Sequence, residues 1–316
     1  MELTLKHARY FVAAAQAGQV SRAAVELNVS QSAVTTAIRD LEANLGVQLF
    51  ERRPRGVALT EAGTRFLRHA KELLAVAHEA MNLSADDQTR LRGRVRIGMS
   101  YTVAGYFAIP VLARVKRRFA GLDLSLCEDR RDVIEQELVQ GRLDLAIILT
   151  SNLGERALLD HVTLVQSKRR LWLPSGHRLA GRDDLPLSVI EDEPYILLTV
   201  DEAKNTQIRY WQDRQVSPRI AFETSSVEAV RTMVASGMGI TVLSDMVYRP
   251  WSLDGQRIET SDITEGVVPQ MMIGVCWNAQ APLGPAPRAI VDFLMQIFGI
   301  DHQTPPDPRP SHHPQV

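Results

Sequence analysis

The chain has 316 residues, of which 45% are hydrophobic and 23% are charged, and its formal net charge is −1. This length predicts two or three domains rather than one core. The even charge balance means that any nucleic-acid partner must be bound by a local basic patch. The two cysteines, Cys127 and Cys276, lack metal-ligand spacing, which excludes a disulfide scaffold and a zinc module.

The sequence shows no feature of an exported or membrane protein. It has no run of 18 apolar residues, so no transmembrane helix is expected. The amphipathic N-terminal segment predicts a helix rather than a signal peptide, and a reducing cytoplasm is the expected location. The proline-rich tail, residues 301–316, is expected to be disordered, and no metal site is expected there.

Three short helices are expected in the first 46 residues. Apolar residues from Leu5 to Ala15 recur at three- and four-residue steps, and Gly18 ends this first helix. Ser21 is the expected N-cap of the second helix, and Ser30 that of the third. The third helix should end at Gly46. Its expected inner face is Val34, Ile38, Leu41 and Leu45. The brief turn between the second and third helices is typical of a helix-turn-helix.

Polar residues on the opposite face of the third helix are candidates for DNA contacts. This face carries Gln31, Ser32, Thr35, Thr36 and Arg39. Such side chains are suited to base edges and phosphates in a major groove, whereas a merely solvated face is the alternative. Ser21 and Ser30, at the helix starts, are expected to join them in binding DNA.

The next segment, residues 49–60, has the pattern strand, basic turn, strand, which predicts a wing. Arg52, Arg53 and Arg55 gather at its tip and would repel one another unless a phosphate neutralised them. Residues 1–71 hold ten Lys and Arg against six Asp and Glu, a net charge of +4, which leaves −5 for the rest of the chain. This asymmetry predicts DNA binding by the first part alone.

A long helix is predicted from residue 61 to about Leu83. Its apolar stripe consists of Phe66, Leu67, Ala70, Leu73, Leu74 and Ala77. A small neighbouring domain offers little surface to cover so long a helix, so packing on its copy in a second subunit is expected. Packing within its own chain is the alternative.

The first 63 residues resemble the DNA-binding region of the LysR-type transcriptional regulators. The resemblance rests on the run Ala23-Ala24-x2-Leu27-x2-Ser30-Gln31-Ser32-Ala33-Val34-x3-Ile38-x2-Leu41-Glu42-x2-Leu45-Gly46-x2-Leu49-Phe50-x-Arg52, followed by Thr60-x-Ala62-Gly63. It implies a winged helix-turn-helix in residues 1–60, mainly α-helical, and a linker and dimerisation helix in residues 61–90. It also implies double-stranded operator DNA, RNA polymerase and a homodimer or tetramer as partners.

Residues 92–301 alternate between strand and helix patterns, which is typical of a mostly parallel sheet. Expected strands are 94–98, 123–127, 145–149, 194–199, 219–223, 240–243 and 271–276, and expected helices are 103–119, 134–140, 226–236 and 287–298. This pattern resembles the family's α/β effector domain, which is built like a periplasmic binding protein. The resemblance implies an effector domain in 91–300, with lobe one in 92–166 and 268–300 and lobe two in 167–267.

Ligands of open α/β sheets bind beyond the carboxyl ends of the strands. Candidate effector-binding residues at such ends are Ser100, Tyr101 and Thr102; Thr199 and Asp201; and Thr224, Ser225 and Ser226. Free amides at helix starts suit a carboxylate or phosphate, which predicts a small anionic metabolite as effector. Plain helix capping is the alternative. Arg131 lies near another pocket position of the family and would clamp a carboxylate, unless it is only solvated.

The sequence offers no motif for an enzyme. It lacks G-x-S-x-G, H-E-x-x-H and G-x-x-x-x-G-K, and Gly237-Met238-Gly239 lacks the third glycine of a dinucleotide site. A redox response through Cys127 and Cys276 is an alternative, but both lie in apolar strand patterns where buried, inert thiols are expected. A transport solute-binding protein would need an export signal and would carry no helix-turn-helix. The prediction is a regulator without a cofactor, apart from its small-molecule effector.

Overall fold

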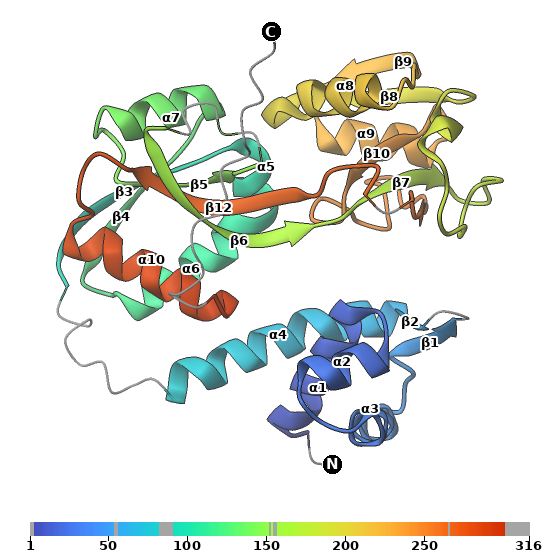
Figure 1. Cartoon of the computed structure of the whole chain (residues 1–316), viewed down its shortest axis with the longest axis horizontal. Helices are drawn as coiled ribbons and strands as arrows, with labels where there is room; N and C mark the ends of the chain where they lie inside the picture. Colours follow the sequence, from blue (N-terminus) through green and yellow to red (C-terminus); the bar gives the residue numbers. More distant parts are fainter. Residues whose placement is uncertain are drawn as a thin grey trace, which may run out of the picture. The chain divides into compact units, whose positions relative to one another are not determined.

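Two units, Met1–Asp86 and Asp87–Val316, make up the chain in the computed structural model (Figure 1). The structure describes residues 3–53, 56–81, 91–151, 153, 157–264 and 266–300. The predicted wing-tip residues Pro54 and Arg55, the end of the predicted linker (82–90) and the tail (301–316) lie outside the described residues, as does the side chain of Arg53.

The first unit is a three-helix core with a two-stranded wing and a long helix. In chain order its elements are α1 (Leu5–Ala17), α2 (Val20–Glu26), α3 (Gln31–Leu45), β1 (Phe50–Arg53), β2 (Gly56–Leu59) and α4 (Glu61–Met81). Phe11 lies at the centre of the core, with its ring centroid 5.0 Å from those of Phe50 and Phe66. The small, buried Ala23 and Ala24 let α2 pack closely on its neighbours. The predicted helix-turn-helix is therefore confirmed.

Most helix ends follow the expected signals. Ser30 caps α3 by accepting the N–H of Ala33 at 3.2 Å, and Gly18 and Gly46 end α1 and α3 in left-handed conformations. Two expectations were wrong. Ser21 lies inside α2, because the turn at Gly18 lets the helix begin at Val20, with Gln19 at the N-cap. Leu45 is 36% exposed, because the last turn of α3 extends past the core.

Backbone contacts tie the wing to the helices. Glu42 Oε1 accepts the N–H groups of Leu49 and Phe50 at 2.7 and 3.1 Å. The N–H of Val57 donates to the carbonyl of Gly18 at 2.8 Å. A Cβ on Gly56 would lie 2.2 Å from that carbonyl oxygen, and Gly56 also has φ +148°, so the position requires glycine. The orientation of the wing is thus set by contacts with α1 and α3.

The apolar residues of α4 are partly covered by the chain itself and partly exposed. Ala70 is 2% exposed, and Phe66, Leu67 and Leu74 pack against the helical core of the same chain. Leu73 and Val76 are 37% and 57% exposed. The expectation that the whole stripe faces a second subunit was therefore wrong for Phe66, Leu67, Ala70 and Leu74, which the chain covers itself.

The second unit contains a five-stranded sheet of order β4-β3-β5-β12-β6. Its strands are β3 (Gly93–Met99), β4 (Leu122–Glu128), β5 (Leu145–Leu149), β6 (Leu159–Ser167) and β12 (Met271–Asn278). β3 runs parallel to β4 and β5, whereas β12 runs antiparallel to β5 and β6, so the sheet is mixed rather than mostly parallel. The helices α6 (Ile109–Arg118) and α10 (Pro285–Phe298) cover one face, and α7 (Arg131–Val139) covers the other.

A second group of strands follows β6 along the chain. It comprises β7 (Arg169–Pro174), β8 (Pro194–Leu198), β9 (Arg219–Thr224), β10 (Thr241–Ser244) and β11 (Ile258–Ser261). β10, β7 and β11 form an antiparallel sheet, β8 pairs parallel with β9, and a bridge between Tyr195 and Ile240 joins the two sets. The helices of this part are α8 (Ala203–Asp213) and α9 (Val227–Ala235).

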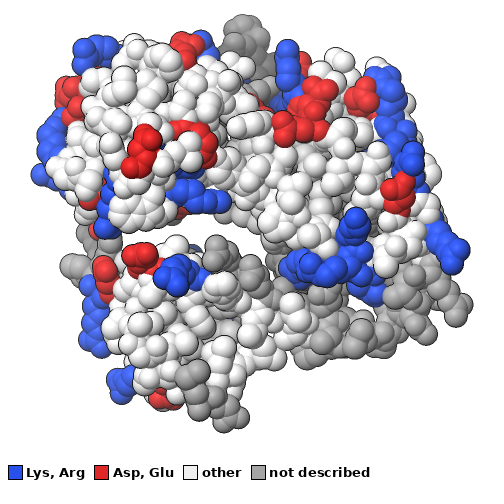
Figure 2. All heavy atoms as spheres, turned by 180° about the vertical axis from the view of Figure 1, so that it is seen from behind, with Lys and Arg blue, Asp and Glu red and all other residues white. Residues whose placement is uncertain are grey.

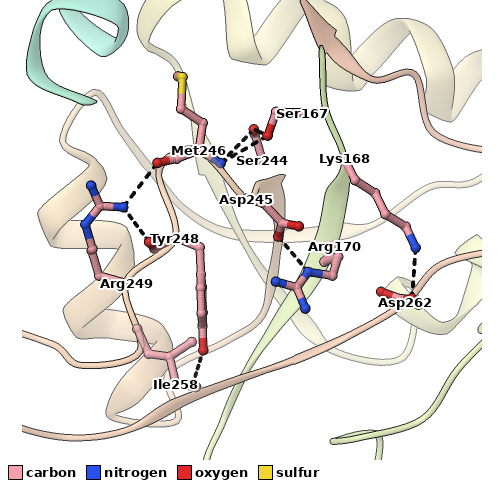
Figure 3. Close-up of polar contacts among 10 residues, drawn as sticks. All are labelled: Ser167, Lys168, Arg170, Ser244, Asp245, Met246, Tyr248, Arg249, Ile258 and Asp262. Carbon is pink, nitrogen blue, oxygen red and sulfur yellow. Dashed lines mark hydrogen bonds and ion pairs between the residues drawn. The ribbon is translucent and has the colours of Figure 1, made fainter. Parts of the chain in front are cut away.

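Hydrogen bonds hold the segment where the chain passes from β6 to β7. The hydroxyl of Ser244 lies 2.7 Å from that of Ser167, which also accepts the N–H of Met246 (Figure 3). The ion pair Arg170–Asp245 measures 2.6 Å, and Lys168–Asp262 measures 2.8 Å. These contacts fix the start of β7 against β10 and the residue that follows β11.

Candidate DNA-binding and effector sites

The N-terminal end of α3 presents an exposed polar surface. Gln31, Ser32, Thr36 and Arg39 are exposed, whereas Thr35 is half-buried and donates its hydroxyl to the carbonyl of Gln31 at 2.9 Å. Arg52 is exposed on the wing strand β1. In a helix-turn-helix this end of the second helix enters the major groove. The geometry is compatible with the predicted DNA face.

A hollow of about 310 Å³ lies between α1 and α3 beside this surface. It is lined by Lys6, His7, Ser30, Ser32, Ala33, Thr36, Ala37 and Asp40. Lys6 and His7 were missed by the sequence analysis, because they precede the helix-turn-helix and carry no motif of their own. Lys6 and His7 place one exposed ammonium group and one imidazole at the rim of the candidate DNA face.

The structure brings together two of the predicted groups of effector-binding residues. The backbone N–H of Thr102, in the short helix α5 (Tyr101–Val103), donates to Asp201 Oδ2 at 2.5 Å. Ser100 and Thr102 are 1% and 3% exposed, whereas Tyr101 is 40% exposed. The amide expected to bind an effector's anion therefore already has a carboxylate of the same chain as its acceptor.

The third group acts as helix caps and turn contacts. Thr224 Oγ1 accepts the N–H of Ser226, and Ser226 Oγ accepts the N–H of Ala229, each at 3.1 Å. The N–H of Thr199 donates to the carbonyl of Thr224 at 2.9 Å, and Ser225 is exposed. Ser226 thus caps α9 and Thr224 holds the turn before it, and a hydroxyl in either role keeps lone pairs able to accept from a ligand.

Arg131 is not a solvated side chain. It forms an ion pair with Glu135 of the same helix, and the two side chains are only 10% and 4% exposed. A guanidinium held in such a pair would have to break this buried ion pair in order to clamp a ligand, which is costly. Arg131 is therefore a poor candidate for effector binding.

A second contact joins the two parts of this unit and was missed by the sequence analysis. Tyr106 lies in the π-helical turn Ala104–Ala108, and its hydroxyl donates to Glu228 Oε1 of α9 at 2.9 Å. Arg231, 3% exposed, pairs with Glu228 and donates to the carbonyl of Val247 at 2.7 Å. The hydrogen bond from Arg231 lowers the pKa of Glu228, and burial raises the pKa of Tyr106.

The two cysteines lie on one line across the five-stranded sheet. Cys127 pairs with Gly98, Gly98 with Ala146, and Ala146 with Cys276. Three steps of about 4.8 Å separate the cysteine backbones by roughly 14 Å, well beyond the roughly 7 Å limit for a disulfide. The two thiols therefore cannot pair within the folded sheet.

The individual thiols differ in exposure. Cys276 is buried as expected, and burial raises the pKa of its thiol. The expectation for Cys127 was wrong, because no described element covers the side chains of the second half of β4, and Cys127 is an exposed residue. Partial burial and the carboxylates of Glu137 and Asp129 raise the pKa of Cys127. A raised thiol pKa disfavours the reactive thiolate.

Family models match both units of the chain. The bacterial regulatory helix-turn-helix protein, lysR family, matches residues 5–64, and the LysR substrate binding domain matches residues 88–299. The chain belongs to the LysR family. It is thus a LysR-type DNA-binding transcriptional regulator with an effector-binding domain, and not an enzyme.

The family relatives are similar over nearly their whole length. The "Probable hydrogen peroxide-inducible genes activator" of Mycobacterium avium is 29% identical, with 95% of this chain and 96% of the relative covered. The RuBisCO operon transcriptional regulator of Allochromatium vinosum is 28% identical, with 93% and 96% covered. The crystal structure of HinK, a LysR family regulator from Pseudomonas aeruginosa, is 30% identical with a TM-score of 0.61, and 94% and 99% are covered.

Neither a membrane span nor a metal cluster is found in the part of this LysR-type regulator that the structure describes. None of its described helices combines the length and apolar character needed to cross a bilayer. The described residues contain no group of three or more His, Cys, Asp or Glu side chains able to hold a metal ion. On the face shown in Figure 2, basic and acidic side chains lie next to one another over the second unit.

Proposed function

We propose that this LysR-type regulator binds operator DNA as a dimer, with one α3 helix of each subunit in the major groove. The exposed Leu73 and Val76 on α4 support pairing through the exposed side of that helix. Paired recognition helices would contact successive major-groove faces about 34 Å apart. The exposed polar end of α3 and Arg52 on the wing are the proposed DNA contacts.

The effector site lies, in this proposal, at the junction of two lobes, residues 92–166 with 268–300 and residues 167–267. The contact between the N–H of Thr102 and the carboxylate of Asp201 carries the proposal, because it joins the helix start after β3 to the segment after β8. An anionic metabolite that accepts from Thr102 would have to displace Asp201. Binding would therefore change how the lobes meet, and only such a differential interaction can shift a conformational equilibrium.

The change between lobes would be transmitted to DNA through the arrangement of subunits. We propose a tetramer of two dimers that acts on RNA polymerase in the cytoplasm, in keeping with the family resemblance. If ligand binding favours one arrangement of the subunits, it changes the affinity for operator DNA. DNA binding then changes the affinity for the ligand by the same coupling free energy.

To test this proposal, operator fragments are first selected from genomic DNA by their binding to the full chain. Operator affinity is measured by fluorescence anisotropy with and without carboxylates, amino acids and sugar phosphates. We expect Ser100→Ala to keep operator affinity and to lose the ligand response, because the buried Ser100 hydroxyl beside this amide has no hydrogen-bond partner among the described residues and is available to a ligand. Arg39→Ala should instead weaken operator binding in both conditions. A full ligand response in Ser100→Ala would contradict the proposed site.

A further inference from the structure

Each of the two parts of the effector domain packs one side chain against the hydrophobic cluster of the other. Tyr106 packs against a cluster whose other described members all lie within residues 172–258. Met246 belongs to that range, yet it also packs against the cluster of the five-stranded sheet, whose other described members lie within residues 91–165 and 271–300. Tyr106 and Met246 are thus the residues of these two clusters that cross the junction of the lobes.

Polar contacts add to the packing of Tyr106. Its hydroxyl donates to Glu228 Oε1 at 2.9 Å, and the guanidinium carbon of Arg249 lies 5.4 Å from the centroid of its ring, within the range of a cation–π interaction. The guanidinium of Arg249 donates in turn to the carbonyls of Met246 and Tyr248, at 3.2 and 2.6 Å (Figure 3). The hydroxyl and the ring of Tyr106 therefore each contact a different segment of the second lobe.

The residue four positions after Tyr106 explains the unusual backbone at this place. Pro110, at the start of α6, has no N–H to donate to the carbonyl of residue 106, and its ring crowds that carbonyl. The chain here forms the π-helical turn Ala104–Ala108 instead of a regular α-turn. Within this turn Tyr106 packs on the second lobe, whereas Phe107 packs on the first. Single π-helical turns occur frequently at functional sites.

The contact of Tyr106 follows the contact between Thr102 and Asp201 along the same helical segment. Both acceptors belong to residues 167–267, since Asp201 precedes α8 and Glu228 lies in the first turn of α9. They are separate carboxylates on separate elements. An anion that displaces Asp201 from the N–H of Thr102 would therefore leave the contact between Tyr106 and Glu228 in place.

We infer that Tyr106 limits the separation of the two lobes, and that an effector has to act against this contact in order to move them. The inference rests on the two-lobed arrangement proposed above. A hydrogen bond to a charged group changes an equilibrium by roughly tenfold to a hundredfold. Tyr106 should raise the effector concentration needed for a response by the same factor, because it lowers the population of the arrangement that the effector favours.

Distances between spin labels on the two lobes test this inference without DNA or ligand. Ser188→Cys and Gln296→Cys place labels at exposed positions of the second and first lobe, respectively. Cys127→Ser removes the exposed native thiol, whereas Cys276 is buried. Labelled full-length subunits are diluted with an excess of unlabelled ones, so that pulsed electron paramagnetic resonance reports distances within one subunit. The result does not depend on where the effector binds, so it is independent of the ligand-response test of the proposed site.

Tyr106→Phe removes only the hydroxyl and keeps the ring. We expect it to raise the ratio of separated to joined lobes about tenfold or more over the wild type, seen as a second population of distances. Tyr248→Phe is the matched control, because its hydroxyl donates to the carbonyl of Ile258 inside the second lobe, and it should keep the distances of the wild type.

Pro110→Ala is an independent variant at an exposed position. It restores an N–H for the carbonyl of residue 106, so the π-helical turn should close to an α-turn and move Tyr106 away from Glu228. The same second population of distances is expected. A merely structural hydrogen bond would lower the melting temperature of Tyr106→Phe without changing the distances. Unchanged distances in Tyr106→Phe, or an equal change in Tyr248→Phe, would overturn the inference.

Discussion

The carboxylate of Asp201 accepts the backbone N–H of Thr102 at 2.5 Å, across 99 positions of sequence. Asp201 adopts a left-handed conformation, with φ 48° and ψ 39°, which is unusual for a residue other than glycine. Such conformations persist where surrounding contacts determine them, and they gather at ligand clamps and switches. The chain thus supplies its own anion at the helix start where an effector's carboxylate was expected.

Removal of one wing arginine should weaken DNA binding without changing sequence preference. Arg52→Ala is expected to reduce the slope of log K against log salt concentration by about 0.9, because one phosphate contact is lost. Arg65→Ala on the exposed side of α4 is the matched control and should leave the slope unchanged. Fluorescence anisotropy over a salt series measures both, and an unchanged slope in Arg52→Ala would refute the phosphate contact.

Glu42 should stabilise the first unit through the wing. Glu42→Ala leaves the N–H groups of Leu49 and Phe50 without their acceptor, so we expect the free energy of unfolding to fall by about 1–3 kcal/mol. Glu42→Gln keeps an acceptor oxygen and should lose less. Glu26→Ala removes only an exposed ion pair of 3.6 Å with Arg22 and should have almost no effect. Urea denaturation distinguishes these variants, and equal stability of Glu42→Ala and Glu26→Ala would contradict the account.

Asp144 gives the effector domain a defined dependence on pH. Burial alone would raise its pKa, but hydrogen bonds from the side chain and N–H of Arg96 lower it below the usual value. Because the pKa of Asp144 is lower in the folded than in the unfolded protein, its ionised carboxylate stabilises the fold at pH values above the unfolded pKa of about 3.9. This stabilisation is lost as the pH falls through the pKa of the folded protein. Asp144→Asn should therefore be less stable than the wild type at neutral pH, and the difference should shrink below about pH 4.

Thermal unfolding of both proteins over a pH series measures this difference. Arg94→Ala, which breaks an exposed pair with Asp123, is the control and should show little change at any pH. A difference between Asp144→Asn and the wild type that is constant down to pH 2 would contradict the assignment.

The exposed part of α4 should control assembly. Val76→Glu places a charge on the apolar surface left uncovered by the chain, so we expect it to dissociate the dimer while the first unit stays folded. Val47→Glu also adds a charge at an exposed valine, but away from α4, and should leave assembly unchanged. Sedimentation velocity measures both, and an intact Val76→Glu dimer would place the interface elsewhere.

The helix-turn-helix could be predicted because its signals are local. Ser30 and Gly46 bound α3 by their own chemistry, and Thr60 of the family motif caps α4 by accepting the N–H of Gly63 at 2.9 Å. Ser21 failed as a cap because Gly18, three residues earlier, already turns the chain. A hydroxyl residue near the start of a helix does not by itself show which residue is the N-cap, because the preceding turn determines where the helix begins.

The second unit was harder to read, because its strands and contacts depend on distant segments. β6 was missed since its side chains alternate irregularly between buried and exposed, and α8 was missed because its sequence is largely polar. The hydroxyl groups of the candidate site were found, yet their partners were not. Whether Thr102 meets a ligand or Asp201 is decided by the tertiary fold, and no spacing in the sequence records it.

The most direct test of the central claim compares the wild type with Asp201→Asn in thermal unfolding at fixed chloride, against a panel of carboxylates, aromatic acids and sugar phosphates. Removal of the competing charge should let an anionic effector stabilise Asp201→Asn at a lower concentration than the wild type. An anion that stabilises the wild type and binds Asp201→Asn equally or more weakly would contradict displacement of Asp201 as the basis of the response.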